Sequence, residues 1–156
     1  MTLDGYESTH RLFQILHQAH NVNQALTKIA RLSTGLRFEQ VSLLCALNSV
    51  GGKATIGTLA RHVSRASHTV TALVDTLEAR DYLARDRSAV EDRRLVWIRL
   101  MPRGAAAASA FQDKLQEVIA ARDLERLFPD LLTDMDVTAV ALKDALTQDQ
   151  LQKFVR

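Results

Sequence analysis

Three arginines lie within eight positions near the middle of the sequence, where their side chains could bind a polyanion. They are Arg87, Arg93 and Arg94. A guanidinium group can enter a narrow minor groove, where the negative potential of DNA is concentrated. Asp92 can hold the guanidinium of Arg94 through paired hydrogen bonds and set its direction before DNA arrives. The alternative is an ion pair that only stiffens a hairpin and contributes about 0 to 1 kcal/mol to stability.

A second group of candidate DNA contacts comes earlier in the chain. Small and polar side chains at the start of a helix can meet base edges, and methyl groups of threonine and alanine suit thymine methyls. The N–H groups at a helix start favour a phosphate, which a nearby arginine can also contact. In the alternative interpretation Ser67 is only a cap and Thr69 only a turn residue. The group comprises Arg65, Ser67, His68, Thr69, Thr71 and Ala72.

Catalytic chemistry has little support. The sequence holds no Gly-rich phosphate loop, no nucleophile elbow and no paired metal motif. His62, His68 and Asp75 with a nearby serine could suggest a triad, but all lie on one short segment that a DNA-binding surface already explains. We therefore predict that the protein is not an enzyme, has no catalytic residues and needs no cofactor.

Two other residue types could sense a signal. His10, His17 and His20 recur along one helix and could converge on a divalent ion, although exposed or hydrogen-bonded histidines explain the spacing more simply. Cys45 could be a redox trigger, but the apolar run from Leu43 to Leu47 favours a buried, inert thiol. We predict no metal site.

The composition describes an ordinary globular chain. Of 156 residues, 47% are apolar and 24% charged, with two prolines, six glycines and one cysteine. One cysteine excludes an internal disulfide or a multi-cysteine zinc site. The sequence shows no targeting segment and no apolar run long enough to cross a bilayer, so we expect a cytoplasmic protein. The net charge is only +2, yet residues 53–103 hold ten basic and six acidic residues, which places the candidate polyanion-binding surface there.

Helical periodicity dominates the first half of the chain. Apolar residues spaced by three and four predict a long helix from Tyr6 to Ser33, which Gly35 ends. Phe38 to Leu47 is apolar nearly all round and predicts a short buried helix. Thr55 can cap a third helix and Ser67 a fourth that runs to Arg80. The few residues between these last two helices indicate a helix-turn-helix.

The second half of the chain begins with residues whose pattern alternates, as is typical of β-strands. Residues 82–100 alternate at both ends of a charged stretch, which predicts a β-hairpin with a charged tip. Pro102 suits the first turn of another helix, and a last helix is predicted from about Thr133 to Phe154. The predicted fold is therefore mainly α with a small β-wing, a winged helix-turn-helix between long terminal helices. A core of this size leaves apolar stripes on those helices uncovered, and a second copy of the chain would cover them.

Residues 36–104 resemble the MarR family of bacterial transcriptional regulators in order and spacing. The resemblance rests on Leu59-Ala60-Arg61-His62-Val63, on the run from Thr69 to Leu83, on Glu91-Asp92-Arg93-Arg94 and on Pro102-Arg103-Gly104. Gln40 also falls where the family usually has glutamine. The chain departs from the family pattern at Ser64-Arg65, Ala72, Asp81 and Met101. Asp81 replaces a frequent glycine, and aspartate is one of the few other residues that tolerate a left-handed backbone.

The resemblance implies a homodimeric repressor that binds a pseudo-palindromic double-stranded operator, with Arg94 as the arginine inserted into the minor groove. It implies dimerisation helices over residues 1–35 and 102–156, with the DNA-binding domain over 36–101. Family members commonly respond to small aromatic or phenolic anions bound between the dimer helices and the winged domain.

Four residues could line an effector pocket of this kind: Phe13, His17, His20 and Phe111. They could equally be interface or surface residues. A metal- or redox-responsive repressor of the same fold stays open as an alternative, and so does a winged-helix module that binds another protein.

Overall fold

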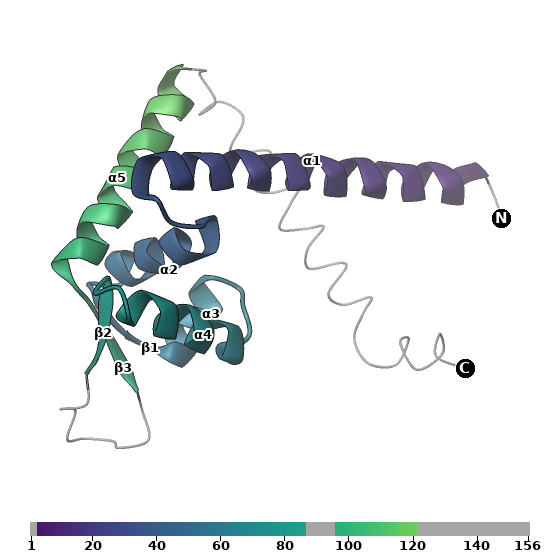
Figure 1. Ribbon diagram of the computed structural model, residues 1–156. Coiled ribbons are helices and arrows are strands. Elements are labelled where there is room, and N and C mark those ends of the chain that lie inside the picture. Colours follow the sequence, from purple (N-terminus) through teal and green to yellow (C-terminus); the bar gives the residue numbers. More distant parts are fainter. Residues whose placement is uncertain (1–2, 87–95, 122–156) are drawn as a thin grey trace, which may run out of the picture. The chain divides into compact units, whose positions relative to one another are not determined.

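The computed structural model describes residues 3–86 and 96–121 and confirms a mainly helical chain with a small β-wing (Figure 1). Residues Met1–Leu115 form one compact unit, and every packing contact described below belongs to it. None of the described helices is long and apolar enough to cross a membrane. The elements in chain order are α1 (Leu3–Thr34), α2 (Phe38–Ser49), β1 (Lys53–Thr55), α3 (Ile56–His62), α4 (Ser67–Glu78), β2 (Leu83–Asp86), β3 (Trp97–Leu100) and α5 (Pro102–Ala121).

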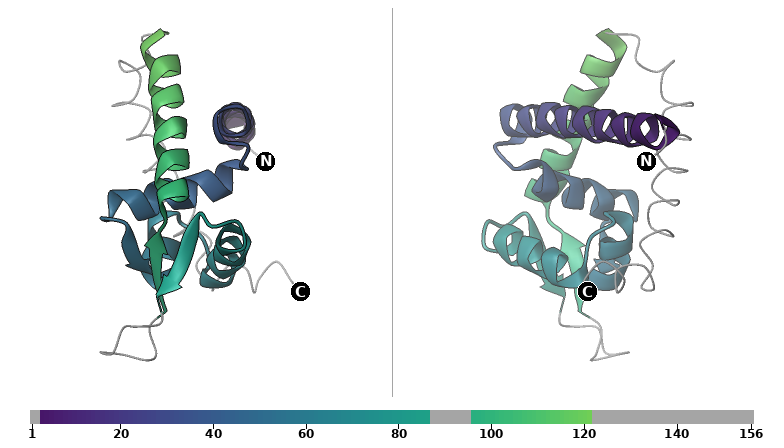
Figure 2. Two further views of the ribbon diagram at one scale, coloured as in Figure 1. Left: turned by 60° about the vertical axis from the view of Figure 1, so that its left-hand side comes forward. Right: turned by 90° about the vertical axis from the view of Figure 1, so that its right-hand side faces the viewer.

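Among the described residues of α1, those of the last part pack against the core. Ala30 is fully buried, and Leu26 and Ile29 pack against the core. Figure 2 shows α1 beside α2, which it contacts. Earlier in the helix Leu16 and Val22 are 52% and 57% exposed, so the described residues leave the predicted apolar stripe uncovered there.

The helix α2 forms the centre of the core. It contacts α1, α3, α4 and the sheet, and burial of its leucines and valine stabilises the fold by about 1.5 to 3 kcal/mol per side chain. Gln40 is the one buried polar residue among the described residues, and its Oε1 accepts a hydrogen bond from Arg37 N at 3.0 Å. The buried residues of α2 are Gln40, Val41, Leu43, Leu44 and Leu47.

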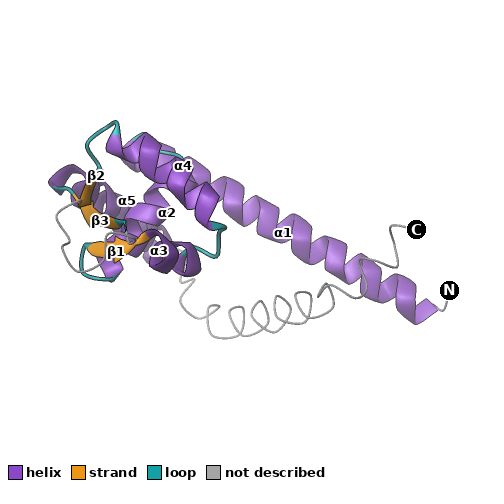
Figure 3. Ribbon diagram, turned by 90° about the horizontal axis from the view of Figure 1, so that it is seen from below, coloured by secondary structure: helices purple, strands orange, loops and turns teal. Residues whose placement is uncertain are grey.

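The predicted helix-turn-helix is present as α3 and α4 (Figure 3). Thr55 caps α3 as expected, because its hydroxyl accepts a hydrogen bond from Thr58 N at 3.2 Å. Ser64 takes a left-handed φ of 49°, and Arg65 N then donates to Ala60 O at 3.0 Å, which ends α3 in a tight turn. The prediction that Ser67 caps α4 is wrong. Ala66 occupies the N-cap position, because its extended backbone directs its carbonyl to Val70 N and makes Ser67 the first helical residue.

The predicted hairpin forms part of a three-stranded antiparallel sheet in the order β1-β3-β2. The strand β1 was not predicted, because three residues are too few to show an alternating pattern. Ile98 of β3 pairs with Ala54 of β1 on one side and with Arg85 of β2 on the other. Ile98 and Ala54 are buried, so this face of the sheet closes the core.

The connection from α4 to β2 and the start of α5 meet closely. Asp81 has a left-handed φ of 59°, as its residue type allowed, and Tyr82 follows as a buried residue. Tyr82 O accepts a hydrogen bond from Met101 N at 3.1 Å, just before α5 begins at Pro102 as predicted. The predicted helix from Thr133 to Phe154 lies outside the described residues.

Candidate nucleic-acid interface

The start of α4 presents the predicted base-reading side chains on an anchored helix. Val70, Val74 and Leu77 form its fully buried stripe and hold it on the core. Of the predicted contacts, Thr69 and Thr71 are half-buried, and Arg65, Ser67, His68 and Ala72 are exposed. The structure therefore brings all six together at the turn and the first half of α4.

The first turn of α4 has backbone N–H groups available to a ligand. Its N-cap, Ala66, has no side-chain oxygen that could accept hydrogen bonds from these groups. Within the turn, Thr69 N donates to Ala66 O at 3.0 Å, but Ser67 and His68 come too early in the helix for an acceptor in the preceding turn. An uncapped helix start beside Arg65 suits a phosphate group.

The predicted wing contacts belong to the segment between β2 and β3. Arg87, Asp92, Arg93 and Arg94 lie outside the described residues. The two strands that lead into this segment are described: Asp86 is the last residue of β2, and it pairs with Trp97 of β3. Lys53 Nζ of β1 lies 2.8 Å from Asp86 Oδ2 and 5.4 Å from the centre of the Trp97 ring.

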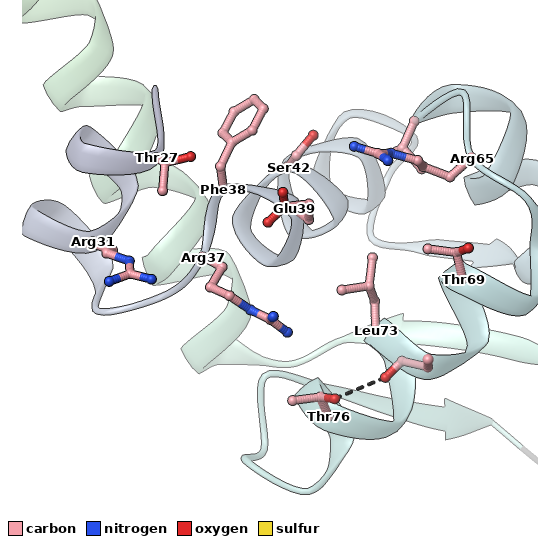
Figure 4. A pocket seen from close by; sticks show the side chains of 12 residues that line it. Thr27, Arg31, Arg37, Phe38, Glu39, Ser42, Arg65, Thr69, Leu73 and Thr76 are labelled. Carbon is pink, nitrogen blue, oxygen red and sulfur yellow. Dashed lines mark hydrogen bonds between the residues drawn. The ribbon is translucent and has the colours of Figure 1, made fainter. Parts of the chain in front are cut away.

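A cavity of about 590 Å³ lies between the end of α1, the start of α2 and the face of α4 (Figure 4). Its wall carries three guanidinium groups, those of Arg31, Arg37 and Arg65, against the single carboxylate of Glu39. Phe38 and Leu73 add apolar surface, and serine and threonine hydroxyls complete the wall. Such a wall suits a small anion with an apolar or aromatic body. Arg31 and Arg37 were not predicted as site residues, because nothing in their local sequence pattern shows which helix they face.

The cavity shares residues with the candidate DNA surface. Arg65, Thr69 and Ala72 belong to both. Because one guanidinium cannot bind a ligand carboxylate and a DNA phosphate with the same donors, occupancy of the cavity would affect DNA contact.

The four residues predicted to line an effector pocket are not among those that line this cavity. Phe13 is 64% exposed, and His17 and His20 are exposed on the same helix. Phe111 is buried in the core, where its ring lies 6.1 Å from that of Phe38. In the described part of a single chain, Phe111 is thus buried in the core, whereas the other three residues are exposed on α1.

The next residues are the histidines of α1 and Cys45, which the sequence offered as possible sensors of a metal ion or of oxidation. His10 and His20 are exposed and lie within hydrogen-bond distance of Gln14 and Gln24 on α1. The described residues contain no group of three or more side chains placed to hold a metal ion. Burial raises the pKa of the Cys45 thiol to about 11, and its Sγ lies 3.8 Å from Ala108 O. A thiol with this pKa stays protonated at neutral pH, which makes a poor redox trigger.

The sequence and the fold are similar to those of known proteins. Residues 38–96, from the start of α2 to the residue before β3, match the model of the MarR family. Residues 38–96 therefore form a MarR-family segment. As a MarR protein with this helix-turn-helix and wing, the chain is a DNA-binding transcriptional regulator and not an enzyme. Comparison with curated proteins gives no match.

Solved structures share the MarR fold at low sequence identity. The organohalide-sensing regulator RdhR in its 2,4-dichlorophenol-bound form is 20% identical, with a TM-score of 0.68 over 88% of this chain and 80% of that one. Reduced AbfR bound to DNA is 19% identical, with a TM-score of 0.69 over 88% and 99%. BpsR of Bordetella bronchiseptica, whose DNA binding is regulated by 6-hydroxynicotinic acid, is 23% identical, with a TM-score of 0.60 over 79% and 98%.

Proposed function

We propose that this MarR protein is a homodimeric repressor that places α4 in the major groove of a pseudo-palindromic operator. The observation that carries the proposal is the exposed, polar and uncapped start of α4, held on the core by its buried stripe. Arg87, Arg93 and Arg94 would add contacts in the adjacent minor groove, with Asp92 supporting Arg94. Such a regulator would work in the cytoplasm, where it meets its operator.

The dimer is inferred from the uncovered part of α1. The stripe that is buried around Ala30 continues toward the N-terminus through Leu16, which is half exposed. A second copy of the same helix would cover it without a different partner. In this proposal residues 1–35 and 102–156 hold the dimer together, and residues 36–101 bind DNA. The two copies of α4 would then lie about 34 Å apart, one helical turn of DNA.

The proposed effector is a small aromatic or phenolic anion. The cavity between α1, α2 and α4 supports it, because three arginines line it together with the apolar side chains of Phe38 and Leu73. Two proteins of the same fold respond to or bind molecules of this class: RdhR has been solved with 2,4-dichlorophenol bound, and 6-hydroxynicotinic acid regulates DNA binding by BpsR. A ligand that binds the DNA-free form more tightly than the DNA-bound form would release the operator.

Selection from a randomised pool of duplex DNA tests the proposed function. The expected result is an inverted repeat with half-sites about one helical turn apart, and an affinity that falls steeply with salt. The absence of any enriched sequence or low-salt binding would refute the repressor and favour a winged-helix module that binds another protein.

Thr71→Val is expected to change the preferred base at one operator position, at a cost of about 1 to 3 kcal/mol for the wild-type operator. Thr71 lies in the exposed first half of α4, and its Oγ1 donates to Ser67 O at 2.9 Å. Measured affinities for single-base operator variants would show the change.

Thr76→Val is the matched control. Its Oγ1 makes the same kind of hydrogen bond, to Ala72 O at 2.9 Å, but it lies in the second half of α4. Equal effects of the two substitutions on base preference would contradict the assignment of the reading surface to the helix start.

Arg37→Ala is expected to abolish the response to an aromatic anion and leave operator affinity nearly unchanged. Arg37 reaches the cavity but is not a predicted DNA contact, and Gln40 accepts its backbone N–H, which alanine retains (Figure 4). Operator binding would be measured with increasing 2,4-dichlorophenol or 6-hydroxynicotinic acid as the first probes. Arg61→Ala, which removes an exposed arginine from α3, is the control. An unchanged response of Arg37→Ala to a ligand that releases the wild type would exclude this cavity as the effector site.

A further inference from the structure

The strand β2, which leads into the wing, contacts α4 through the side chain of Arg85. The guanidinium of Arg85 forms ion pairs with Asp75 and with Glu78, which lie one helical turn apart on α4. The backbone N–H of Arg85 also donates to Glu78 Oε1 at 2.9 Å. Glu78 thus binds both the main chain and the side chain of Arg85. Because the main chain is bound as well, the contact fixes the position of the strand and not only that of the guanidinium group.

The burial of these groups shows that the contact is part of the packing between β2 and α4. The Arg85 side chain is 19% exposed, compared with 34% for Glu78 and 60% for Asp75. Arg85 pairs with Ile98 across the sheet, so it lies on the face that closes the core. Figure 1 shows α4 beside β2 at this point, and the two elements are in contact.

A second contact lies on the opposite face of the same strand. Successive side chains of a strand alternate between its faces, so Asp86 lies away from the core, where Lys53 contacts it at 2.8 Å. The strand is therefore held on both faces at its last two residues. The next residue in the sequence is Arg87, the first of the arginines proposed to contact the minor groove.

We propose that Arg85 is a positioning residue for DNA binding: it fixes where the wing leaves the sheet relative to the base-reading face of α4. This inference rests on the proposed function, in which α4 and the wing bind one half-site together. A major-groove helix and a minor-groove arginine can contact the same half-site only at one relative placement, and a binding group must be held close to its productive geometry. Asp75 is 60% exposed and Glu78 34% exposed, so solvent screens these ion pairs in part and limits their contribution to the stability of the fold. Their removal should therefore affect this placement more than it affects folding.

Operator binding by Arg85→Ala, Arg94→Ala and the double variant tests the proposal. The operator is the sequence recovered from the randomised pool, prepared with A-tract flanks and with G·C-rich flanks. Arg85→Ala is expected to bind roughly tenfold more weakly, comparable with the loss of one good base contact. It should also lose the preference for A-tract flanks, whose narrow minor groove favours an inserted arginine. Arg85→Lys should restore most of both properties.

The double variant distinguishes positioning from an independent contact. If Arg85 acts through the wing, the double variant binds within about twofold of Arg94→Ala, because interacting residues are not additive. Additive losses, or a retained flank preference in Arg85→Ala, would overturn the inference. If Arg94→Ala itself binds like the wild type, the proposed wing contact fails and this inference fails with it.

Two further variants exclude simpler explanations. Arg99→Ala removes one positive charge from β3, where Arg99 is exposed and lies on the opposite face of the sheet from Arg85. It is expected to keep the flank preference. The triple variant Asp75→Asn, Glu78→Gln, Arg85→Gln removes the bridge with all its charges, and it should bind as weakly as Arg85→Ala. Recovery of affinity in the triple variant would overturn the inference. Arg85 would then act only by neutralising the negative charges of Asp75 and Glu78, and not by positioning the wing. Urea midpoints of all variants would show whether each is folded.

Discussion

Gly104→Ala is expected to destabilise the unit Met1–Leu115 by about 3 kcal/mol or more, the upper range for overpacking a close-packed site. A Cβ at this position would collide with the backbone carbonyl of Tyr82, closer than real Cβ atoms approach, and would lie 2.8 Å from Leu100 Cδ1. The leucine end can move, but the carbonyl belongs to the connection that joins α4 to β2. Urea unfolding followed by circular dichroism would measure the loss.

Gly57→Ala is the matched control within the same unit. Gly57 lies in α3, and a Cβ there would meet only Thr55 Oγ1 at 3.9 Å. Alanine forms helix more readily than glycine, so this variant should gain about 0.5 to 1 kcal/mol. Equal stability of Gly104→Ala and wild type would mean that the start of α5 can move away from Tyr82 without loss.

Local patterns were enough to predict most of the elements. The apolar spacing of α1 and α4, the Thr55 cap and the glycine after α1 each act within a few residues, so they can be recognised from the sequence. The left-handed backbone at Asp81 was predicted from the residue type at a family glycine position. These features decide the order of the elements, and the order of the elements decides the fold.

Features that depend on distant residues could not be predicted. The strand β1 exists because β3, more than forty residues later, pairs with it. The cavity draws Arg31, Arg37 and Arg65 from separate segments, and no local pattern shows that their side chains share a wall. The bridge from Arg85 to Glu78 has a related cause, since it depends on how β2 docks on α4. Functional contacts built between elements are therefore the part that a single sequence shows least.

Leu16→Asp with Val22→Asp is expected to separate the proposed dimer and to weaken operator binding by about 10² to 10⁴-fold, the usual gain from linking two binding modules. Both side chains are more than half exposed in the single chain, so the charges should leave its fold intact. In a dimer the same positions would be buried against the partner, where an unpaired carboxylate is costly. Sedimentation velocity would report the oligomeric state, and titration of the recovered operator would report the affinity.

The control places the same number of carboxylates elsewhere on α1. Gln14→Glu with Asn21→Asp changes two exposed polar residues that lie about half a turn away from the stripe through Leu16 and Ala30. This variant should remain a dimer and lose little affinity, because only general repulsion from DNA changes. A stable dimer in the Leu16 and Val22 variant would exclude this stripe as the interface. A monomer that still binds the full operator at wild-type affinity would show that the two half-sites are read independently, which contradicts a homodimeric repressor.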